Sequence, residues 1–314
     1  MLRTDSNLAS LLLVNRLVDS GAEPLGPKEY WRLIGQVGEP SRLLEMGSAE
    51  IGELLPGIDG ARIRTLLDAS TQLAFELERL DRTGIRVLSP FDDGYPQRLR
   101  DRLGGAAPPI LHVVGPLELL EADGLGIVGS RNITPDAERI AVEAARLAAE
   151  QGLSTISGAA KGTDITAMGA AFDAGGTVVG ILADPLDRKL RQPDIRRAIG
   201  EDRLTLASPF KPGAGFSVAG AMSRNKVIYA SSKVTLVVAS DHQKGGTWQG
   251  ATEALRKGYG GVAVWQGPGE GPGNRHLVSA GSTAVGSVEE LRGLLLSPES
   301  QAQTAGPDQL SFGL

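Results

Sequence analysis

The sequence predicts an α/β fold in which a doubly wound, mostly parallel sheet follows a small helical domain. From residue 110 onward, short apolar runs alternate with helical segments, as in sheets whose parallel strands are joined by helices. Several runs are apolar at successive positions, which is typical of strands covered on both faces. The expected strands are 84–88, 111–114, 125–128, 154–156, 177–182, 204–207, 234–238 and 262–265. The clearest expected helix is 134–150, with Pro135 in its first turn and Gly152 after its end.

The first part of the chain is predicted to be mainly helical. Apolar residues recur at helical spacing over 8–18 and 61–80. Between them, the turn 55–60 is of the kind that joins the helices of SAM-like or helix-hairpin-helix modules, where backbone N–H groups meet a DNA phosphate. A simple interhelical turn is the other interpretation, because the turn itself carries no basic residue.

These patterns divide the chain into three expected parts. Residues 1–105 form a helical domain with its connector, residues 106–296 form a Rossmann-like domain, and residues 297–314 form a flexible polar tail. The chain has 314 residues, of which 41% are hydrophobic. That is enough apolar material for a sizeable core.

Composition excludes several kinds of chemistry. The sequence contains no cysteine, so disulfides, thiol catalysis and cysteine-ligated zinc are excluded. Its three histidines, His112, His242 and His276, lack metal-ligand spacing. We therefore expect neither a metal nor a cofactor. The N-terminal residues do not form a signal peptide, and no apolar stretch approaches the roughly 18 residues of a membrane span, so we expect a cytoplasmic protein.

Charge is distributed unevenly along the chain. The net charge is −5, yet residues 221–258 hold six basic and two acidic residues, a local charge of +4. Such a cluster indicates either a phosphate-binding surface or a solvated face.

Polar, glycine-containing segments follow the predicted strands, where ligands bind in open parallel sheets. After strand 125–128 come Gly129, Ser130 and Arg131, which offer a close backbone approach, a hydroxyl and a guanidinium suited to phosphate. Gly124, Gly126 and Gly129 also match the spacing of a dinucleotide fingerprint. Two of these glycines precede the turn, and the next strand does not end in an acidic residue, so the pattern does not indicate NAD binding.

Three further segments carry the remaining candidate residues. Small residues let a main chain wrap an anion, and basic side chains add charge. These candidates are Ser157, Gly158 and Lys161 after strand 154–156, Arg224, Asn225 and Lys226 before strand 234–238, and Lys244 after it. Together with the first segment, they predict a phosphate-binding cleft.

The order of these segments resembles the DprA/Smf family of DNA-processing proteins over residues 8–296. The matching segments are GIVGSRNITP (126–135), SGAAKGTD (157–164), SPFKPG (208–213), SRNKVIYASS (223–232), FDDGYPQRLR (91–100) and GNRHLVSAG (273–281). The resemblance implies a helical domain joined to an extended Rossmann-like domain, in a short form of the family without a C-terminal winged-helix domain.

The resemblance also implies a function and partners. Family members bind single-stranded DNA without strong sequence preference, help to load the RecA recombinase during natural transformation, are usually dimeric and are not known as enzymes. By motif, Arg131, Lys161, Arg224 and Lys226 would contact the DNA backbone. The sequence departs from the family where Lys161 replaces the usual arginine and Met168 replaces a frequent histidine.

The last residues suggest another partner. Asp308, Gln309, Leu310, Ser311 and Phe312 resemble the short peptides that dock into the bacterial sliding clamp. Gln309, Leu310 and Phe312 would be the docking residues. A tail without a partner is the alternative, because five-residue matches arise readily by chance.

The main alternative function is enzymatic. Residues 244–253 loosely resemble the glycine-rich loop and helix of nucleotide-processing phosphoribohydrolases, with Gly245 and Gly246 in the loop and Glu253 as the acid. Arg131 would then hold a nucleotide phosphate. A nucleotide sensor of the same fold is a related alternative. No phosphate-loop signature of nucleotide hydrolases occurs in the sequence.

Overall fold

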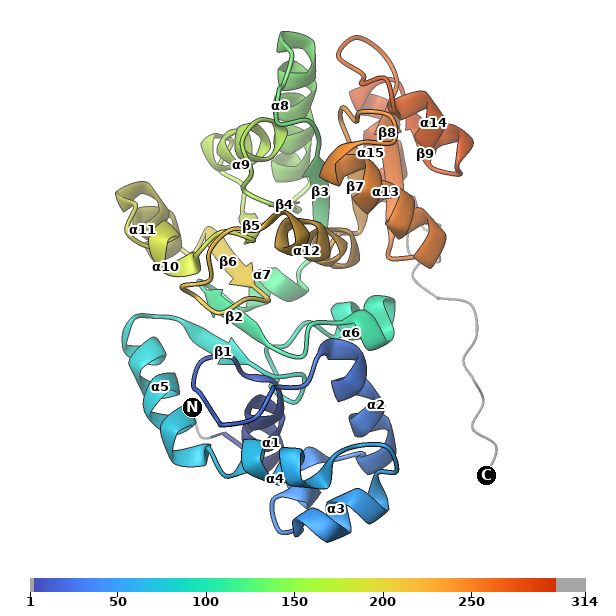
Figure 1. The fold of residues 1–314 in the computed structure, drawn as a ribbon. Helices are drawn as coiled ribbons and strands as arrows, with labels where there is room; N and C mark the ends of the chain where they lie inside the picture. The colour runs from blue at the N-terminus through green and yellow to red at the C-terminus, as the bar shows by residue number, and fades with distance from the viewer. Residues whose placement is uncertain (1–2, 298–314) are drawn as a thin grey trace.

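The computed structural model describes residues 3–297. A helical N-terminal region lies at one end of the molecule and a large sheet flanked by helices at the other (Figure 1). The N-terminal helices are α1 (Asp5–Val14), α2 (Pro27–Val37), α3 (Ser48–Leu54), α4 (Gly60–Leu67) and α5 (Ser70–Arg82), with a 3₁₀ turn at Pro40–Leu43.

A nine-stranded sheet runs through the rest of the chain. Its strands are β1 (Arg86–Leu88), β2 (Leu111–Val114), β3 (Gly124–Val128), β4 (Ser154–Ser157), β5 (Val178–Ile181), β6 (Leu204–Ser208), β7 (Val234–Val237), β8 (Gly261–Trp265) and β9 (Thr283–Val285). Their spatial order is β1-β2-β6-β5-β4-β3-β7-β8-β9. Strand β2 pairs antiparallel with both of its neighbours, β1 and β6. All the other pairs, from β6 across to β9, are parallel. The mostly parallel, doubly wound fold is therefore confirmed.

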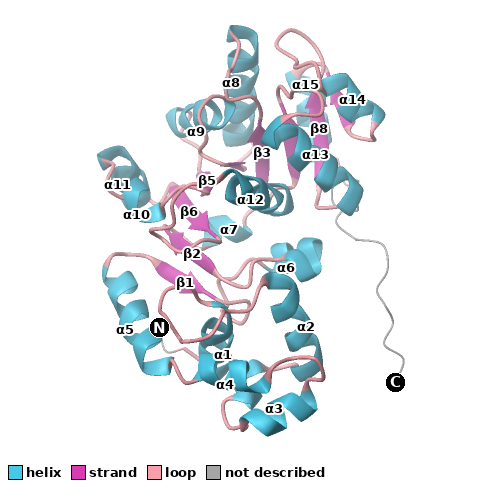
Figure 2. Ribbon diagram, in the orientation of Figure 1, coloured by secondary structure: helices cyan, strands magenta, loops and turns pink. Residues whose placement is uncertain are grey.

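Helices cover both faces of this sheet (Figure 2). They are α6 (Gln97–Leu103), α7 (Glu118–Glu121), α8 (Pro135–Glu150), α9 (Thr163–Asp173), α10 (Leu186–Lys189), α11 (Pro193–Gly200), α12 (Val218–Ser231), α13 (Gly245–Lys257), α14 (Asn274–Ser279) and α15 (Val288–Leu296). Neighbouring residues of one strand enter different cores. Leu236 packs in the cluster that contains α8 and α9 residues, and Val237 packs in the one that contains α12 and α13 residues. This arrangement explains why the strands are apolar at successive positions.

Strand prediction succeeded for eight strands and missed the ninth. The eight expected runs all appear, with ends shifted by at most two residues. β9 was missed because it is three residues long and lies at the sheet edge with Thr283 and Ala284 exposed, so it has no apolar run.

Two helix boundaries differ from the sequence prediction. The helix expected over 8–18 ends at Val14, because the Asn15 side chain accepts hydrogen bonds from the Leu17 and Val18 N–H groups and so competes with helical bonding. The helix expected over 61–80 is divided by Asp68 and Ala69 into α4 and α5. The apolar spacing continues across that break, so it could not be read from periodicity.

The expected turn at 55–60 does join two short helices, α3 and α4. Gly60 allows the helices to pack closely, because a Cβ at this position would overlap the Ser48 carbonyl oxygen. Contact between this turn and DNA stays a prediction.

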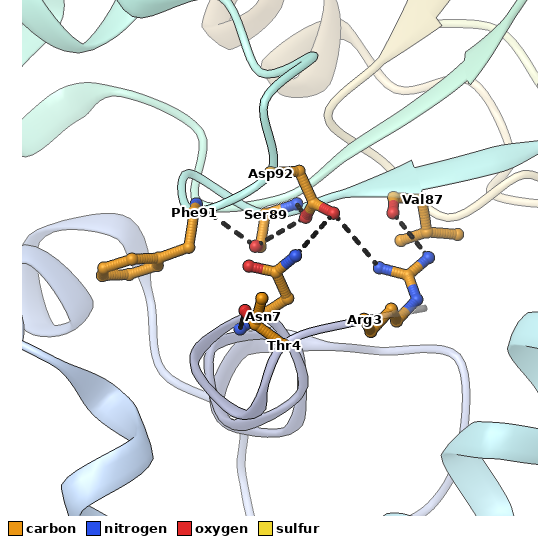
Figure 3. A network of polar contacts seen from close by, with 7 residues as sticks. All are labelled: Arg3, Thr4, Asn7, Val87, Ser89, Phe91 and Asp92. Atoms are coloured by element: carbon orange, nitrogen blue, oxygen red, sulfur yellow. Dashed lines mark hydrogen bonds and ion pairs between the residues drawn. The ribbon is translucent and has the colours of Figure 1, made fainter. Parts of the chain in front are cut away.

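The N-terminal helices are tied to the sheet by a buried polar network (Figure 3). Asp92 accepts hydrogen bonds from the Ser89 N–H and hydroxyl, each 2.7 Å long, and from the Asn7 amide at 2.9 Å. Arg3 donates to the Val87 carbonyl and lies 3.8 Å from Asp92. The family-like segment that begins at Phe91 therefore links α1 to β1, and one hydrophobic cluster spans both regions.

In the described part of the chain, no helix has the length and apolarity of a transmembrane span. The candidate clamp-docking residues Gln309, Leu310 and Phe312 lie outside the described residues.

Candidate functional site

A cavity of about 330 Å³ lies at the carboxyl ends of β3 and β7. The chain runs from β3 outward to β6 and then returns to pair β7 on the other side of β3. This is the topological switch point of the sheet, where open α/β folds bind their ligands. We call the cavity the strand-end cleft. Its lining includes Gly129, Ser130, Arg131, Asn132, Ala160, Asp164, Met222, Arg224, Asn225, Asp241, Lys244, Gly245, Gly246 and Thr247.

Arg224 forms the floor of this cleft. It lies on α12, is 4% exposed, and its Nη1 donates to the Ile181 carbonyl oxygen at 2.6 Å. Its Nε has no hydrogen-bond partner in the described chain. A Cβ at Gly158 would overlap the Arg224 guanidinium, so only glycine leaves room for the arginine. The SGAAKGTD and SRNKVIYASS segments are thus fitted to each other.

Asp164 compensates the buried charge of Arg224. Its carboxylate accepts hydrogen bonds from the N–H groups of Gly158 at 3.1 Å and Ala160 at 3.4 Å. Burial raises the pKa of Asp164 to about 6, and the positive charge of Arg224 opposes that rise. Burial in turn lowers the pKa of Arg224, against the opposing effect of Asp164. Asp164 therefore holds the loop after β4 in place.

Arg131 lies at the opening of the cleft. It is exposed, and its guanidinium carbon lies 5.6 Å from the centre of the Phe216 ring. Ser130 is half-buried, and its hydroxyl is engaged with the backbone of Asn132 at 3.1 Å. The Arg131 fork is therefore available to an incoming anion.

The N-terminus of α13 forms the opposite wall. The Asn225 amide donates to the Gly246 carbonyl at 3.0 Å, and the Thr247 hydroxyl donates to the Gly129 carbonyl at 2.9 Å. These bonds hold the start of the 13-residue helix against α12 and the β3 loop. Lys244 is exposed at its N-cap. The first N–H groups of a helix and its dipole both favour an anion here.

Four of the predicted site residues do not line the cleft, and one of them, Gly158, packs against the Arg224 guanidinium. Ser157 is buried, and its hydroxyl donates to the Ile127 carbonyl at 2.6 Å, so it joins β3 to β4. Lys161 is exposed beside the lining residue Ala160. Lys226 lines a different cavity, because residues two apart on a helix point to nearly opposite sides.

Sequence reasoning missed two residues that shape the cleft. Thr247 joins the start of α13 to the loop after β3 through its hydrogen bond to the Gly129 carbonyl. Asn274 is fully buried, donates to the Val238 and Trp265 carbonyls at 2.9 and 2.8 Å, and accepts from the Ser240 N–H at 2.9 Å. It thereby fixes the chain that leaves β7. Only its position in the GNRHLVSAG segment signalled it.

Glu253, the acid of the enzymatic alternative, is not among the residues that line the cleft. It lies two turns along α13 and accepts a hydrogen bond from the Tyr259 hydroxyl at 3.2 Å. This position does not favour a role in chemistry on a phosphate bound at Arg131.

The described residues contain no group of three or more side chains arranged to hold a metal ion. The cleft instead combines Arg131, Arg224, Lys244 and a helix N-terminus with two carboxylates, those of Asp164 and Asp241. Together with the fold, this arrangement defines a Rossmann-like protein with a cleft rich in basic groups at its switch point.

Comparison with known families identifies which Rossmann-like proteins this chain is related to. Residues 86–295 match the family model of DNA recombination-mediator protein A. The chain belongs to this family, the DprA/Smf DNA-processing proteins.

Individual relatives agree with this membership. A putative DprA of Mycobacterium tuberculosis is 27% identical over 253 residues, which cover 74% of this chain and 58% of the relative. The match thus spans little more than half of that relative's length. DprA of Streptococcus pneumoniae is 29% identical over 210 residues, covering 65% of this chain and 72% of the relative.

Two solved structures share the fold. The X-ray structure of Streptococcus pneumoniae DprA superposes with a TM-score of 0.71 at 22% identity, covering 93% of this chain and 98% of that one. A Helicobacter pylori DprA structure, described in terms of its single-stranded DNA binding mode, has a TM-score of 0.56 at 22% identity and covers 68% of this chain and 95% of that one.

Proposed function

We propose that this protein binds single-stranded DNA by its backbone phosphates at the strand-end cleft. The observation that carries the proposal is the convergence of Arg131, Arg224, Lys244 and the α13 N-terminus on one cavity. Family membership and the DNA-binding relative from Helicobacter pylori support the choice of ligand.

The cleft residues suit phosphate better than bases. Arginine forks and helix N-terminal N–H groups bind phosphate oxygens and carry no sequence information. Aromatic residues make up only 4% of the chain, which argues against extensive base stacking. Binding should therefore be nearly independent of sequence and should weaken as salt rises.

Fluorescence anisotropy with a labelled oligothymidine tests this proposal. The wild-type protein should bind at low salt. The logarithm of its association constant should then fall linearly with the logarithm of the salt concentration. Each lost phosphate contact lowers the slope by about 0.7 for a single strand. Arg131→Gln should therefore weaken binding and flatten the slope by roughly that amount.

A matched control is Arg82→Gln on α5. Arg82 is exposed and pairs with Glu78 far from the cleft residues in sequence, so this variant removes the same charge without touching the cleft. The proposal is wrong if wild type does not bind at low salt, or if both variants weaken binding equally.

We further propose that the protein assists loading of RecA onto the bound strand and acts as a homodimer by binding rather than by catalysis. Intracellular DNA uptake or recombination is the setting that this role implies. The test is the rate at which RecA coats a single strand with and without this protein. An unchanged rate would contradict the loading role and leave DNA binding intact.

A further inference from the structure

A second cavity, of about 470 Å³, lies between the N-terminal helical region and the sheet. We call it the interdomain cavity. It is bounded by the end of α1, the chain leading into α2, strand β2, the loop after β6 and one side of α12. Its lining includes Arg16, Leu25, His112, Phe210, Lys211 and Lys226.

His112 on β2 is the unusual member of this lining. It is 1% exposed, and neither of its ring nitrogens makes a hydrogen bond of normal geometry in the described chain, although the Ser208 backbone on β6 is near enough to raise its pKa. Buried polar groups are nearly always paired in native proteins. Burial lowers the pKa of His112 to about 4, so the neutral ring offers one donor and one acceptor at neutral pH.

The charged residues that line the cavity are basic, although one of them, Arg16, pairs with Glu23 at 2.8 Å. Arg16 and Lys211 are exposed and Lys226 is half-buried, while none of the described lining residues is acidic. Burial lowers the pKa of the Lys226 ammonium group, and the nearby Glu253 carboxylate opposes that shift. The excess of basic residues in the lining would attract an anionic group at this rim.

The remaining walls are apolar. The interdomain cavity is lined on these sides by Leu25, Pro108, Pro109, Ile110 and Phe210. Sites for small molecules combine apolar walls with a few polar groups that fix orientation, within volumes of roughly 300–1,000 Å³. A planar ring could pack between the apolar walls, and its polar edge could hydrogen-bond to His112. A phosphate could lie at the rim, near the basic side chains.

We propose that the interdomain cavity binds a nucleoside monophosphate, with the base beside His112 and the phosphate among Arg16, Lys211 and Lys226. This site is separate from the strand-end cleft, although α12 carries residues of both. A ligand held there would contact the helix whose other side bears Arg224.

Isothermal titration calorimetry of the full chain tests this site, with AMP as the probe and adenosine and inorganic phosphate as comparisons. AMP should bind more tightly than either fragment, because only AMP engages both ends of the cavity. His112→Phe keeps a ring of similar size and removes both nitrogens, so AMP binding should weaken at least tenfold. Lys211→Gln should weaken AMP binding severalfold. Because Lys211 is exposed, this variant keeps the buried residues of the cavity and tests the site even if His112→Phe fails to fold.

The strand-end variant Arg131→Gln separates the two sites. It should leave AMP affinity unchanged while weakening oligothymidine binding. The inference is overturned if wild type gives no AMP binding at millimolar concentrations, if neither His112→Phe nor Lys211→Gln weakens it, or if Arg131→Gln abolishes it. The last result would assign the nucleotide to the strand-end cleft.

Discussion

The two sides of α12 face different cavities, although the basic residues of both sides come from one short sequence segment. Arg224 lines the strand-end cleft, and Lys226 lines the interdomain cavity. Arg224 is 4% exposed, contacts the Ile181 carbonyl and is compensated by Asp164. Lys226, two residues later, is half-buried beside Arg16 and Lys211 at the interdomain cavity. Adjacent basic residues in a motif therefore need not share a ligand, because the helical phase separates them.

Buried and exposed arginines of the strand-end cleft also have different roles. A buried arginine such as Arg224 organises the loops around it as well as attracting an anion. An exposed arginine such as Arg131 is available to the anion and contributes little to the fold. Substitutions at these positions should therefore affect stability and binding in different proportions.

The largest expected effect is on stability at Arg224. Arg224→Ala leaves Asp164 buried without its compensating charge, so the free energy of unfolding should fall by about 3 kcal/mol. Urea denaturation followed by circular dichroism measures the loss. Lys226→Ala on the other side of the helix should cost less than about 1 kcal/mol, since Lys226 is half-buried and keeps solvent contact. Equal losses for the two variants would remove the distinction between the two sides.

The next effect is on DNA affinity. Arg131→Gln should raise the Kd for oligothymidine about tenfold, which corresponds to about 1.4 kcal/mol, and should leave stability nearly unchanged. Lys226→Gln should change the Kd less than about twofold, because its side chain lies outside the strand-end cleft. Anisotropy titrations at one salt concentration give both numbers. A tenfold loss in Lys226→Gln would instead extend the DNA path around α12.

The smallest expected effect depends on pH. The pKa of Asp164 is raised to about 6, so its carboxylate is charged at pH 7 and largely neutral at pH 5. A nearby phosphate favours the neutral form, and DNA affinity should therefore rise a few-fold as pH falls through 6. Asp164→Asn should abolish this pH dependence in anisotropy titrations between pH 7.5 and 5.5. A slope that persists in the variant would have to come from other groups.

Much of the fold could be predicted because the signals are local. The strands carry apolar residues on both faces, and 134–150 has a clear start and end, with Thr134 accepting the capping hydrogen bond from the Ala137 N–H. The segments around Gly129, Gly158 and Lys244 could be gathered into one site because carboxyl ends of parallel strands meet at one edge. The division at residues 105 and 296 stays a prediction. Within the structure, β1 and the N-terminal helices already share a core with the sheet.

The sequence by itself determined the succession of elements and the chemical character of the strand-end loops, since both follow from the order of residue types along the chain. Only the tertiary structure decided which side chains share a cavity. It buried Arg224 against Gly158, placed Lys226 in another cavity, bonded the Ser157 hydroxyl to a neighbouring strand and buried His112. These outcomes depend on helical phase and on packing between distant segments, and no local pattern records either one.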